Sequence, residues 1–231
     1  MRKISRRSFL AVSAAAAAAG VLAACGSTSS SSSSTAASTA SSAASSAGSA
    51  AAGQSYTVGI CQLVEHEALD AATQGFQDAL TEQLGDAVTF DMQNAQNDTA
   101  TCATICNGFV SAGVDLILAN ATASLQAAQA ATADIPILGT SITEYGVALG
   151  LTDFSGTVGG NISGTSDLAP LDEQAAMILE WMPEAKTAGL LYCSAEANSQ
   201  YQVDTIQTYL EDAGLTVTQY PFSDSNDLSS V

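Results

Sequence analysis

The sequence has almost no positive charge beyond its first seven residues. Four of its five Lys and Arg residues lie there, the fifth is Lys186, and all 23 acidic residues lie at or beyond Glu65. A nucleic-acid-binding surface needs cations that neutralise phosphates, and anionic membranes attract basic clusters. The composition therefore excludes nucleic acid as a partner and argues against electrostatic docking on a membrane.

Long apolar runs and the signatures of metal sites and enzymes are also missing. After the N-terminus no segment approaches the run of about 18 apolar residues that a membrane-spanning helix needs. His66 is the only histidine, and Cys102 and Cys106 lack the second Cys or His pair of a zinc site. The glycine-rich segment 156–160 lacks the strand and helix that flank a dinucleotide-binding loop. We therefore expect no metal, no cofactor and no catalytic residues.

The N-terminus has the order of an export signal, with basic residues, a mild apolar stretch and then small residues. Residues 9–22 are too short and too rich in alanine for a stable transmembrane helix, so residues 1–24 are interpreted as a signal peptide. The segment Leu22-Ala23-Ala24-Cys25-Gly26 resembles the lipobox of bacterial lipoproteins, which implies a lipidated Cys25 that anchors the chain to the membrane. The alternative is an ordinary cleavage site beside an incidental cysteine. The pair Arg6-Arg7 leaves both twin-arginine and general secretory export open.

A low-complexity segment follows the signal. Residues 1–54 contain 18 Ala and 16 Ser, and residues 25–54 carry no charge and no hydrophobic period. Such a composition cannot bury enough apolar surface to offset the entropy lost on ordering. We interpret residues 25–54 as a flexible lipidated linker, which leaves residues 55–231 to form a folded core.

The remaining sequence alternates apolar, β-branched runs with helical stripes of apolar residues. The expected strands cover 56–64, 88–92, 114–119 and 135–139, and the expected helices cover 67–84, 99–112 and 122–132. Asp98 or Thr99 is expected to cap the second helix, and Gly85 and Gly113 are expected to end the first and second. Strand–helix units of this length predict a parallel sheet with helices on both faces.

A glycine-rich segment, 144–160, interrupts this pattern, and a second alternating series opens at Asn161. Its expected helices cover 171–182 and a stretch capped by Asn198, its strands cover 187–192 and 215–220, and a last helix begins at Asp224 or Ser225. The sequence thus predicts two α/β lobes, residues 55–160 and residues 161–231.

Several segments resemble ABC-transporter substrate-binding lipoproteins, and more narrowly the family of tryptophan-binding and related aromatic-amino-acid binders. The likeness is carried by segments 64–70 (VEHEALD), 94–98 (NAQND), 161–170 (NISGTSDLAP), 191–192 and 196–199. The resemblance implies a type-I periplasmic-binding-protein fold, in which two α/β lobes close on a ligand. In that family the second lobe continues beyond the point where this sequence stops, so the resemblance implies an incomplete second lobe.

The ligand site is expected at the carboxyl ends of the parallel strands, because ligands of open α/β sheets bind there. In the first lobe this rule selects Gln62, Glu65, His66, Asn94, Gln96, Asn120, Thr122, Thr140 and Ser141. In the second lobe it selects Thr165, Ser166, Asp167, Tyr192, Glu196 and Asn198. Alternative roles stay open, since acidic residues are often plain surface, Tyr192 can be a core residue, Asn198 a helix cap, and His66 a structural or capping residue.

The chemistry of these residues limits the class of ligand that they can bind. No arginine follows residue 7, so a ligand carboxylate would have to bind helix N-termini and hydroxyl groups, near Thr122 or residues 165–166. An α-amino group has acidic candidates in Glu65, Asp98, Asp167 and Glu196. With the resemblance, this predicts a zwitterionic amino acid, with Tyr145 or Tyr192 against an aromatic side chain.

The leading functional hypothesis is a lipid-anchored extracytoplasmic receptor that delivers an amino acid to the permease subunits of an ABC importer. Three alternatives remain. The same fold can serve as a sensory module for a signalling partner. A secreted α/β enzyme is disfavoured, because no nucleophile–base pair is visible. A surface adhesin is supported by the linker alone.

Overall fold

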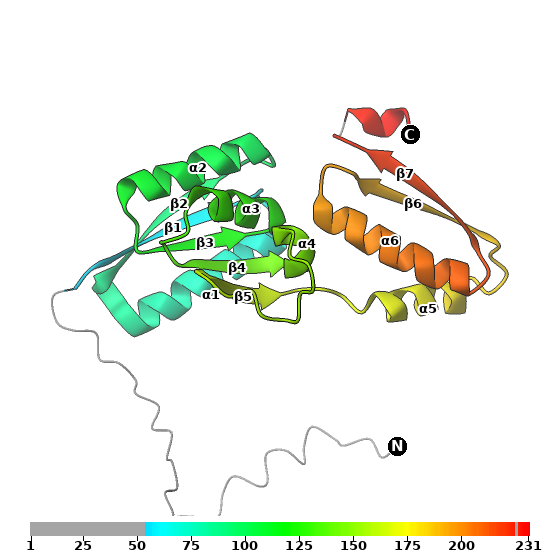
Figure 1. Cartoon of the computed structure of the whole chain (residues 1–231), viewed down its shortest axis with the longest axis horizontal. Helices are drawn as coiled ribbons and strands as arrows, with labels where there is room; N and C mark the ends of the chain where they lie inside the picture. Colours follow the sequence, from blue (N-terminus) through cyan, green and yellow to red (C-terminus); the bar gives the residue numbers. More distant parts are fainter. Residues whose placement is uncertain (1–53, 225) are drawn as a thin grey trace, which may run out of the picture. The chain divides into compact units, whose positions relative to one another are not determined.

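The computed structural model describes residues 54–224 and 226–231 (Figure 1). The signal peptide, Cys25 and the linker were predicted for positions that lie outside these residues. All described residues belong to one compact unit. They form a five-stranded and a two-stranded sheet, which confirms the α/β class. No helix among them has both the length and the apolar character needed to cross a bilayer.

The first sheet is parallel and has the strand order β2-β1-β3-β4-β5. Its strands are β1 (Tyr56–Gln62), β2 (Val88–Asn94), β3 (Leu116–Asn120), β4 (Ile137–Ile142) and β5 (Ile162–Ser166). Ile60 pairs with Met92 on one side and with Leu118 on the other, so the carboxyl ends of these strands reach one edge of the sheet. The central strands are almost fully buried, as their continuous apolar runs predict.

The strand β5 belongs to the first sheet, which corrects the boundary expected between residues 160 and 161. It pairs with β4 from Ile137 and Ile162 onward, and the Asn161 side chain donates to the carbonyl oxygens of Thr132 and Ile135. A Cβ atom on Gly164 would overlap the carbonyl oxygen of Gly139. The close approach of the two strands therefore requires glycine, although glycine weakens the sequence signal of a strand.

Helices cover both faces of the first sheet (Figure 1). On one face α1 (Glu67–Leu84) packs its apolar stripe against β1 and β3, and on the other α2 (Thr99–Ala112) and α3 (Thr122–Ala131) pack with α4 (Tyr145–Leu149). Asp98 caps α2 by accepting from the Thr101 N–H, and Gly113 ends it in the left-handed conformation, as predicted. The short helix α4 lies in the glycine-rich segment, where no regular element was expected.

The second sheet consists of β6 (Thr187–Cys193) and β7 (Thr216–Phe222), which are parallel. Helices α5 (Leu171–Trp181) and α6 (Ala197–Asp212) pack on the face that carries Ala188, Leu190 and Val217. The helix α6 begins after Glu196, so Asn198 lies in its first turn and is not its cap. In place of the expected last helix, a single 3-10 turn, η3, covers Asp227–Ser229.

Candidate ligand-binding pocket

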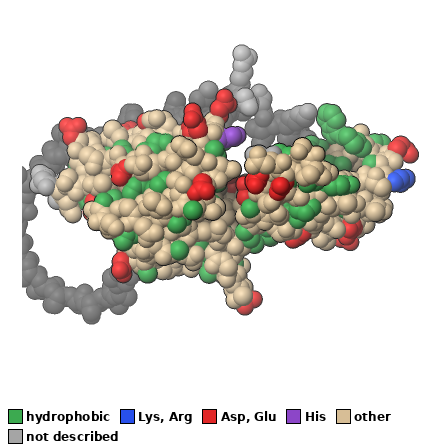
Figure 2. Space-filling model, turned by 90° about the horizontal axis from the view of Figure 1, so that it is seen from above, with side chains coloured by type: hydrophobic (Ala, Val, Ile, Leu, Met, Phe, Trp, Pro, Cys, Tyr) green, Lys and Arg blue, Asp and Glu red, His purple; other side chains and the backbone are tan. Residues whose placement is uncertain are grey.

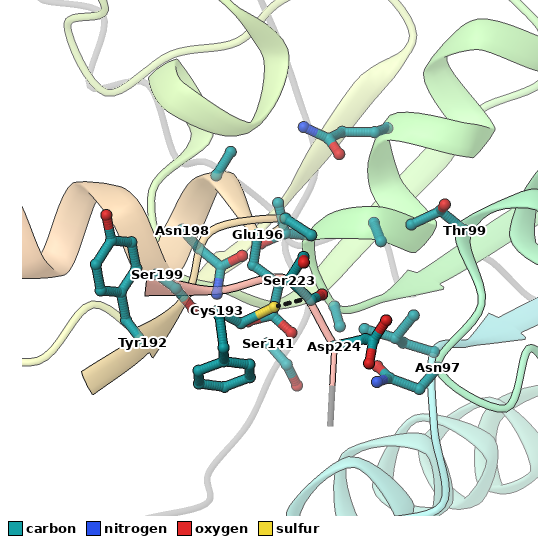
Figure 3. A pocket seen from close by; sticks show the side chains of 18 of the residues that line it. Asn97, Thr99, Ser141, Tyr192, Cys193, Glu196, Asn198, Ser199, Ser223 and Asp224 are labelled. Atoms are coloured by element: carbon teal, nitrogen blue, oxygen red, sulfur yellow. Dashed lines mark hydrogen bonds between the residues drawn. The ribbon is translucent and has the colours of Figure 1, made fainter. Parts of the chain in front are cut away.

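A pocket of about 830 Å³ lies at the carboxyl ends of the strands (Figure 3). From the first sheet and its loops it is lined by Leu63, Gln96, Asn97, Thr99, Ala121, Thr122, Ala123, Gln126 and Ser141. From the second sheet and α6 it is lined by Leu191, Tyr192, Cys193, Ala195, Glu196, Ala197, Asn198, Ser199, Phe222, Ser223, Asp224 and Leu228. Its volume and its mixture of apolar and polar groups are typical of small-molecule sites.

The pocket brings together part of the predicted set of site residues. Six of them line it: Gln96, Thr122, Ser141, Tyr192, Glu196 and Asn198. The others lie outside its lining: Gln62, Glu65, His66, Asn94, Asn120, Thr140, Thr165, Ser166 and Asp167. Ligand contact by any of these residues stays a prediction.

The pocket lining contains an unusual concentration of strained backbone. Four non-glycine residues that line it have positive φ: Gln96 at 53°, Asn97 at 63°, Ala121 at 90° and Ser141 at 57°. Such conformations cost about 1–3 kcal/mol each and gather at ligand-binding sites, where the surrounding structure enforces them. With ψ at 161°, Ala121 lies in a region that glycine alone normally occupies.

Backbone hydrogen bonds beyond the strand ends enforce these conformations. The Leu63 N–H donates to the Asn120 carbonyl at 3.2 Å, and the Asn97 N–H donates to the Leu63 carbonyl at 2.7 Å. The Ala121 N–H donates to the Thr140 carbonyl at 3.0 Å. These bonds join the loops after β1 and β2 to each other and to β3, and join the loop after β3 to β4, which gives the pocket a preformed floor.

Gln62 and Asn120 support this floor from beneath. Both are fully buried, and both bond to Thr73 of α1, through the Gln62 Oε1 at 2.7 Å and the Asn120 Nδ2 at 2.9 Å. Gln62 also donates to Asp70 at 2.6 Å, and Asn120 donates to the Leu69 carbonyl at 2.8 Å. Their amides therefore fix α1 against the sheet. The expectation that ligands bind at the carboxyl ends of the strands had instead suggested that both residues contact the ligand.

The predicted residues around α1 and β2 also make local structural bonds. His66 caps α1, because its Nδ1 accepts from the Ala68 N–H, as one interpretation of this residue predicted. Glu65 is exposed beside it. The Asn94 Oδ1 accepts from the Gln96 N–H at 2.7 Å and thereby shapes the turn that places Gln96 in the pocket lining.

Hydrogen bonds from Tyr145 of α4 and from Ser166 tie β5 to its surroundings. The Tyr145 hydroxyl lies 3.1 Å from the Gly139 carbonyl and 3.3 Å from the Thr165 carbonyl, and the Ser166 hydroxyl donates to the Thr143 carbonyl. Burial, and secondarily the charge of Asp167, raises the pKa of Tyr145 to about 12. Tyr145 is thus a core residue outside the pocket lining, whereas Tyr192, the alternative named for contact with an aromatic ligand, lines the pocket.

The N-terminus of α3 opens on the pocket without a side-chain cap. Its cap position is Ala121, which has no side-chain oxygen, so the first-turn N–H groups gain no partner there. Thr122 and Ala123 of this first turn line the pocket. Thr122 is 6% exposed, and its hydroxyl makes no hydrogen bond among the described residues. This helix end therefore offers unused donors to an anionic group.

The side of the pocket formed by β6, β7 and α6 supplies the charged residues and the aromatic residues of the lining. Glu196 and Asp224 are the only charged residues in the lining. The Tyr192 hydroxyl lies 2.9 Å from the amide oxygens of Gln200 and Gln219, so its polar end is held within the second sheet and its helix. Phe222 is the other aromatic residue of the lining.

Sequence reasoning missed Phe222, Asp224 and Asn97. The strand β7 continues to Phe222, two residues beyond the end expected at residue 220. Pro221 lacks an N–H but is tolerated in this edge strand, where no ladder bond is required of it. Asn97 follows Gln96 in the same loop and lines the pocket with it.

The four cysteines among the described residues are free thiols. Cys61, Cys102 and Cys106 are fully buried, as predicted for small apolar residues, whereas Cys193 is half-buried and lines the pocket. The Cys193 thiol donates to the Ser223 carbonyl (Figure 3).

Comparisons with known proteins agree with this architecture. Residues 57–231 match the family described as ABC transporter substrate binding protein. A tyrosine-binding protein of Clostridioides difficile (strain R20291) is 41% identical over 175 residues, which are 74% of this chain and 50% of that protein. The chain thus spans half the length of this curated relative.

Two solved structures show the same fold in relatives. The ABC domain of Streptococcus pneumoniae in complex with L-Trp is 35% identical, with a TM-score of 0.71 over 77% of this chain and 60% of that one. A ligand-free, open substrate-binding protein with adhesive properties from Clostridium difficile is 41% identical, with a TM-score of 0.56 over 76% of this chain and 60% of that one.

Proposed function

Because the chain belongs to the ABC transporter substrate-binding protein family, we propose that it is a receptor that binds a small solute outside the cytoplasm and delivers it to an ABC permease. The pocket at the strand ends carries this proposal. Its floor is preformed, and its lining comes from both sheets. A ligand that contacts both sheets favours the conformation in which they approach each other, and a permease can distinguish this loaded state from the empty one.

The ligand of this proposal is an aromatic amino acid. The relatives named above bind tyrosine, according to the name of one, and L-Trp, according to the complex of the other. In this chain Phe222, Leu63 and Leu191 supply apolar surface in the pocket lining, and an aromatic ring of the ligand can pack against them.

The charged groups of the amino acid have separate partners. The uncapped first turn of α3 and the Thr122 hydroxyl can hold the carboxylate, because N–H groups and the helix dipole both favour an anion there. Glu196 and Asp224 can hold the ammonium group. This assignment needs no arginine, and none lies among the described residues.

Calorimetry of the chain with the twenty amino acids tests the proposal. Tyrosine, tryptophan or phenylalanine is expected to bind most tightly. Thr122→Val should weaken this binding about tenfold or more, since hydrogen bonds to charged groups contribute about 1.5–3 kcal/mol. Thr81→Val, on the exposed side of α1, is the matched control and should bind as the parent does. Binding of only sugars or metal ions would contradict the proposal.

The membrane anchor forms part of the same proposal. Residues 1–24 act as the signal peptide, Cys25 carries the lipid, and residues 25–54 form the linker. Lipid chains contribute about 0.8 kcal/mol per buried CH₂, so two or more of them hold a soluble domain stably at a membrane. Expression in a bacterium fed an alkyne-bearing fatty acid should label the parent chain and not Cys25→Ala. Equal labelling of both would refute lipidation at this residue.

Adhesion is a second candidate function. The open relative with 41% identity is described as having adhesive properties, and a Ser/Ala-rich linker is suited to presenting a domain away from the membrane. The purified chain, coated on beads, should then attach to epithelial cells, and beads coated with a heat-denatured sample should not. Equal attachment of both bead types would remove adhesion from consideration.

A further inference from the structure

The charge of the pocket lining is entirely negative. Glu196 and Asp224 are its only charged residues, and no Lys or Arg lines it. The surroundings have the same sign, because Lys186 is the only basic residue among the described ones, against 23 acidic residues in the whole chain. Figure 2 shows acidic side chains spread over the visible surface. Clefts lined by charge of one sign focus the potential, so cations are drawn into this pocket and anions are repelled.

Each of the two carboxylates has one oxygen engaged within the described residues. The Glu196 Oε2 accepts from the Ser199 hydroxyl at 2.7 Å, and the Asp224 Oδ1 accepts from the Asn226 N–H at 2.7 Å. The other oxygen of each carboxylate, Glu196 Oε1 and Asp224 Oδ2, can therefore accept a hydrogen bond from a ligand. Glu196 is half-buried and Asp224 is exposed, and a ligand that fills the pocket without a cationic group would lie beside both carboxylates and give them no compensating charge.

The partners of a ligand carboxylate are weaker by comparison. They are neutral donors, namely the first-turn N–H groups of α3 and the Thr122 hydroxyl. A ligand without a carboxylate leaves these neutral donors without a partner, and an unpaired neutral group costs less than an unpaired charge does. The pocket therefore depends more on the ammonium group of its ligand than on the carboxylate.

We propose that the pocket binds primary aromatic amines that carry no carboxylate, such as tyramine and tryptamine, alongside the corresponding amino acids. This inference rests on the proposed function, because it uses the same pocket. The two carboxylates of Glu196 and Asp224 make the cationic amine the required element of recognition, and the carboxylate of an amino acid is an optional one.

Three ligands that differ by one charged group test this inference. The full chain is titrated by calorimetry with L-tyrosine, with tyramine, and with 3-(4-hydroxyphenyl)propionate, which keeps the carboxylate and lacks the amine. Tyramine is expected to bind within about tenfold of L-tyrosine, and the propionate at least about a hundredfold more weakly than L-tyrosine. L-Tryptophan, tryptamine and indole-3-propionate form a second series with the same expected order.

Variants that remove one charge at constant shape identify the groups responsible. Glu196→Gln and Asp224→Asn should each weaken tyramine binding about tenfold or more, and should leave the weak binding of the propionate unchanged or improved. Glu184→Gln is the matched control, because Glu184 is exposed and lies outside the pocket lining. This variant should bind tyramine as the parent chain does.

The outcomes separate this inference from the proposed function. Tight binding of L-tyrosine or L-tryptophan together with a loss of more than a hundredfold for the amines would overturn the inference and leave the proposed function standing. Equal binding of the amines by the parent chain and by both charge variants would overturn the roles of Glu196 and Asp224. Failure of every amino acid and every amine to bind would overturn the proposed function itself, and the inference with it.

Discussion

The two sheets of this chain differ in how completely their apolar residues are buried. Among residues 54–224 and 226–231, every large apolar side chain that is fully buried, apart from Leu210, belongs to the first sheet or to the helices that pack on it. The second sheet has a buried core of three residues, Ala175, Leu210 and Leu215, and its other face exposes Leu191 at 60% and Tyr220 at 42%. The helix α5 exposes Trp181 at 80%. Within the part of the chain that the structure describes, helices therefore cover both faces of the first sheet and one face of the second.

This difference implies unequal local stability. Regions with few buried apolar contacts open at a lower free energy than a well-packed core does. The pocket takes its preformed floor from the first sheet, and its two carboxylates and its phenyl ring from the second. A ligand therefore contacts a rigid surface on the first sheet and a less stable surface on the second sheet. Binding can help to order the second surface.

The largest expected effect comes from removing a core side chain of the first sheet. Phe109 of α2 is 2% exposed and packs directly over Gly59 of β1. Phe109→Ala should lower the free energy of unfolding by about 3–5 kcal/mol, because it leaves a cavity in a layer that has little room to collapse. Urea unfolding followed by circular dichroism measures this loss. Tyr209→Ala, at an exposed site on α6, should change the free energy by less than about 0.5 kcal/mol.

The corresponding truncation in the second sheet should have a more local effect. Leu210 is the only fully buried large apolar residue there, so Leu210→Ala should cost about 2–5 kcal/mol of local stability. Hydrogen exchange should accelerate in β6, β7 and α6 and stay unchanged in β1, β3 and β4. Equal acceleration in both sheets would show that they unfold as one cooperative unit and would remove the distinction drawn above.

Two glycine substitutions test where close packing ends. A Cβ at Gly164 would overlap Gly139 and Tyr145, and its φ of 153° disfavours any other residue, so Gly164→Ala should cost about 1–3 kcal/mol and release β5 from β4. Gly108 lies on α2 with no heavy atom within 4 Å of such a Cβ. Gly108→Ala should therefore stabilise the chain by about 0.5–1 kcal/mol. Thermal unfolding measures both effects, because Gly164→Ala should lower the melting temperature and Gly108→Ala should raise it.

Local sequence signals predicted most of the elements because those elements depend on local chemistry. The helix α1 matches its expected bounds, and Asp98 and Gly113 mark α2 as capping rules require. The placement of β5 was missed, because the close contact of Gly164 with β4 is a tertiary constraint that no local pattern encodes.

The candidate site likewise has features that local sequence patterns predict and features that depend on tertiary contacts. The expectation that ligands bind at the carboxyl ends of the strands selected the edge of the sheet where the pocket lies and six residues of its lining. It could not distinguish side chains that point into the pocket from Gln62 and Asn120, which point to Thr73 beneath it. The strained conformation of Ala121 also comes from hydrogen bonds between loops, which become visible only when the strands are placed together.

The smallest expected effect is a difference in acid sensitivity between the two sheets. The Thr101 hydroxyl and N–H hold the pKa of Asp98 below its usual value, and the Ser223 hydroxyl and N–H do the same for Asp227. A carboxyl whose folded pKa is depressed stabilises the fold above its unfolded pKa of about 3.9, and this contribution is lost as the pH falls through the folded pKa.

Acidification from pH 5 to pH 3 should therefore weaken α2 through Asp98 and the β7–η3 turn through Asp227. Because the second sheet has the smaller core, its hydrogen exchange should accelerate at a higher pH than that of the first sheet. Asp227→Asn should abolish part of this early acceleration, and Asp98→Asn should leave it in place. The opposite pattern, with the first sheet opening first and Asp98→Asn suppressing the change, would reverse the order of stability inferred from burial.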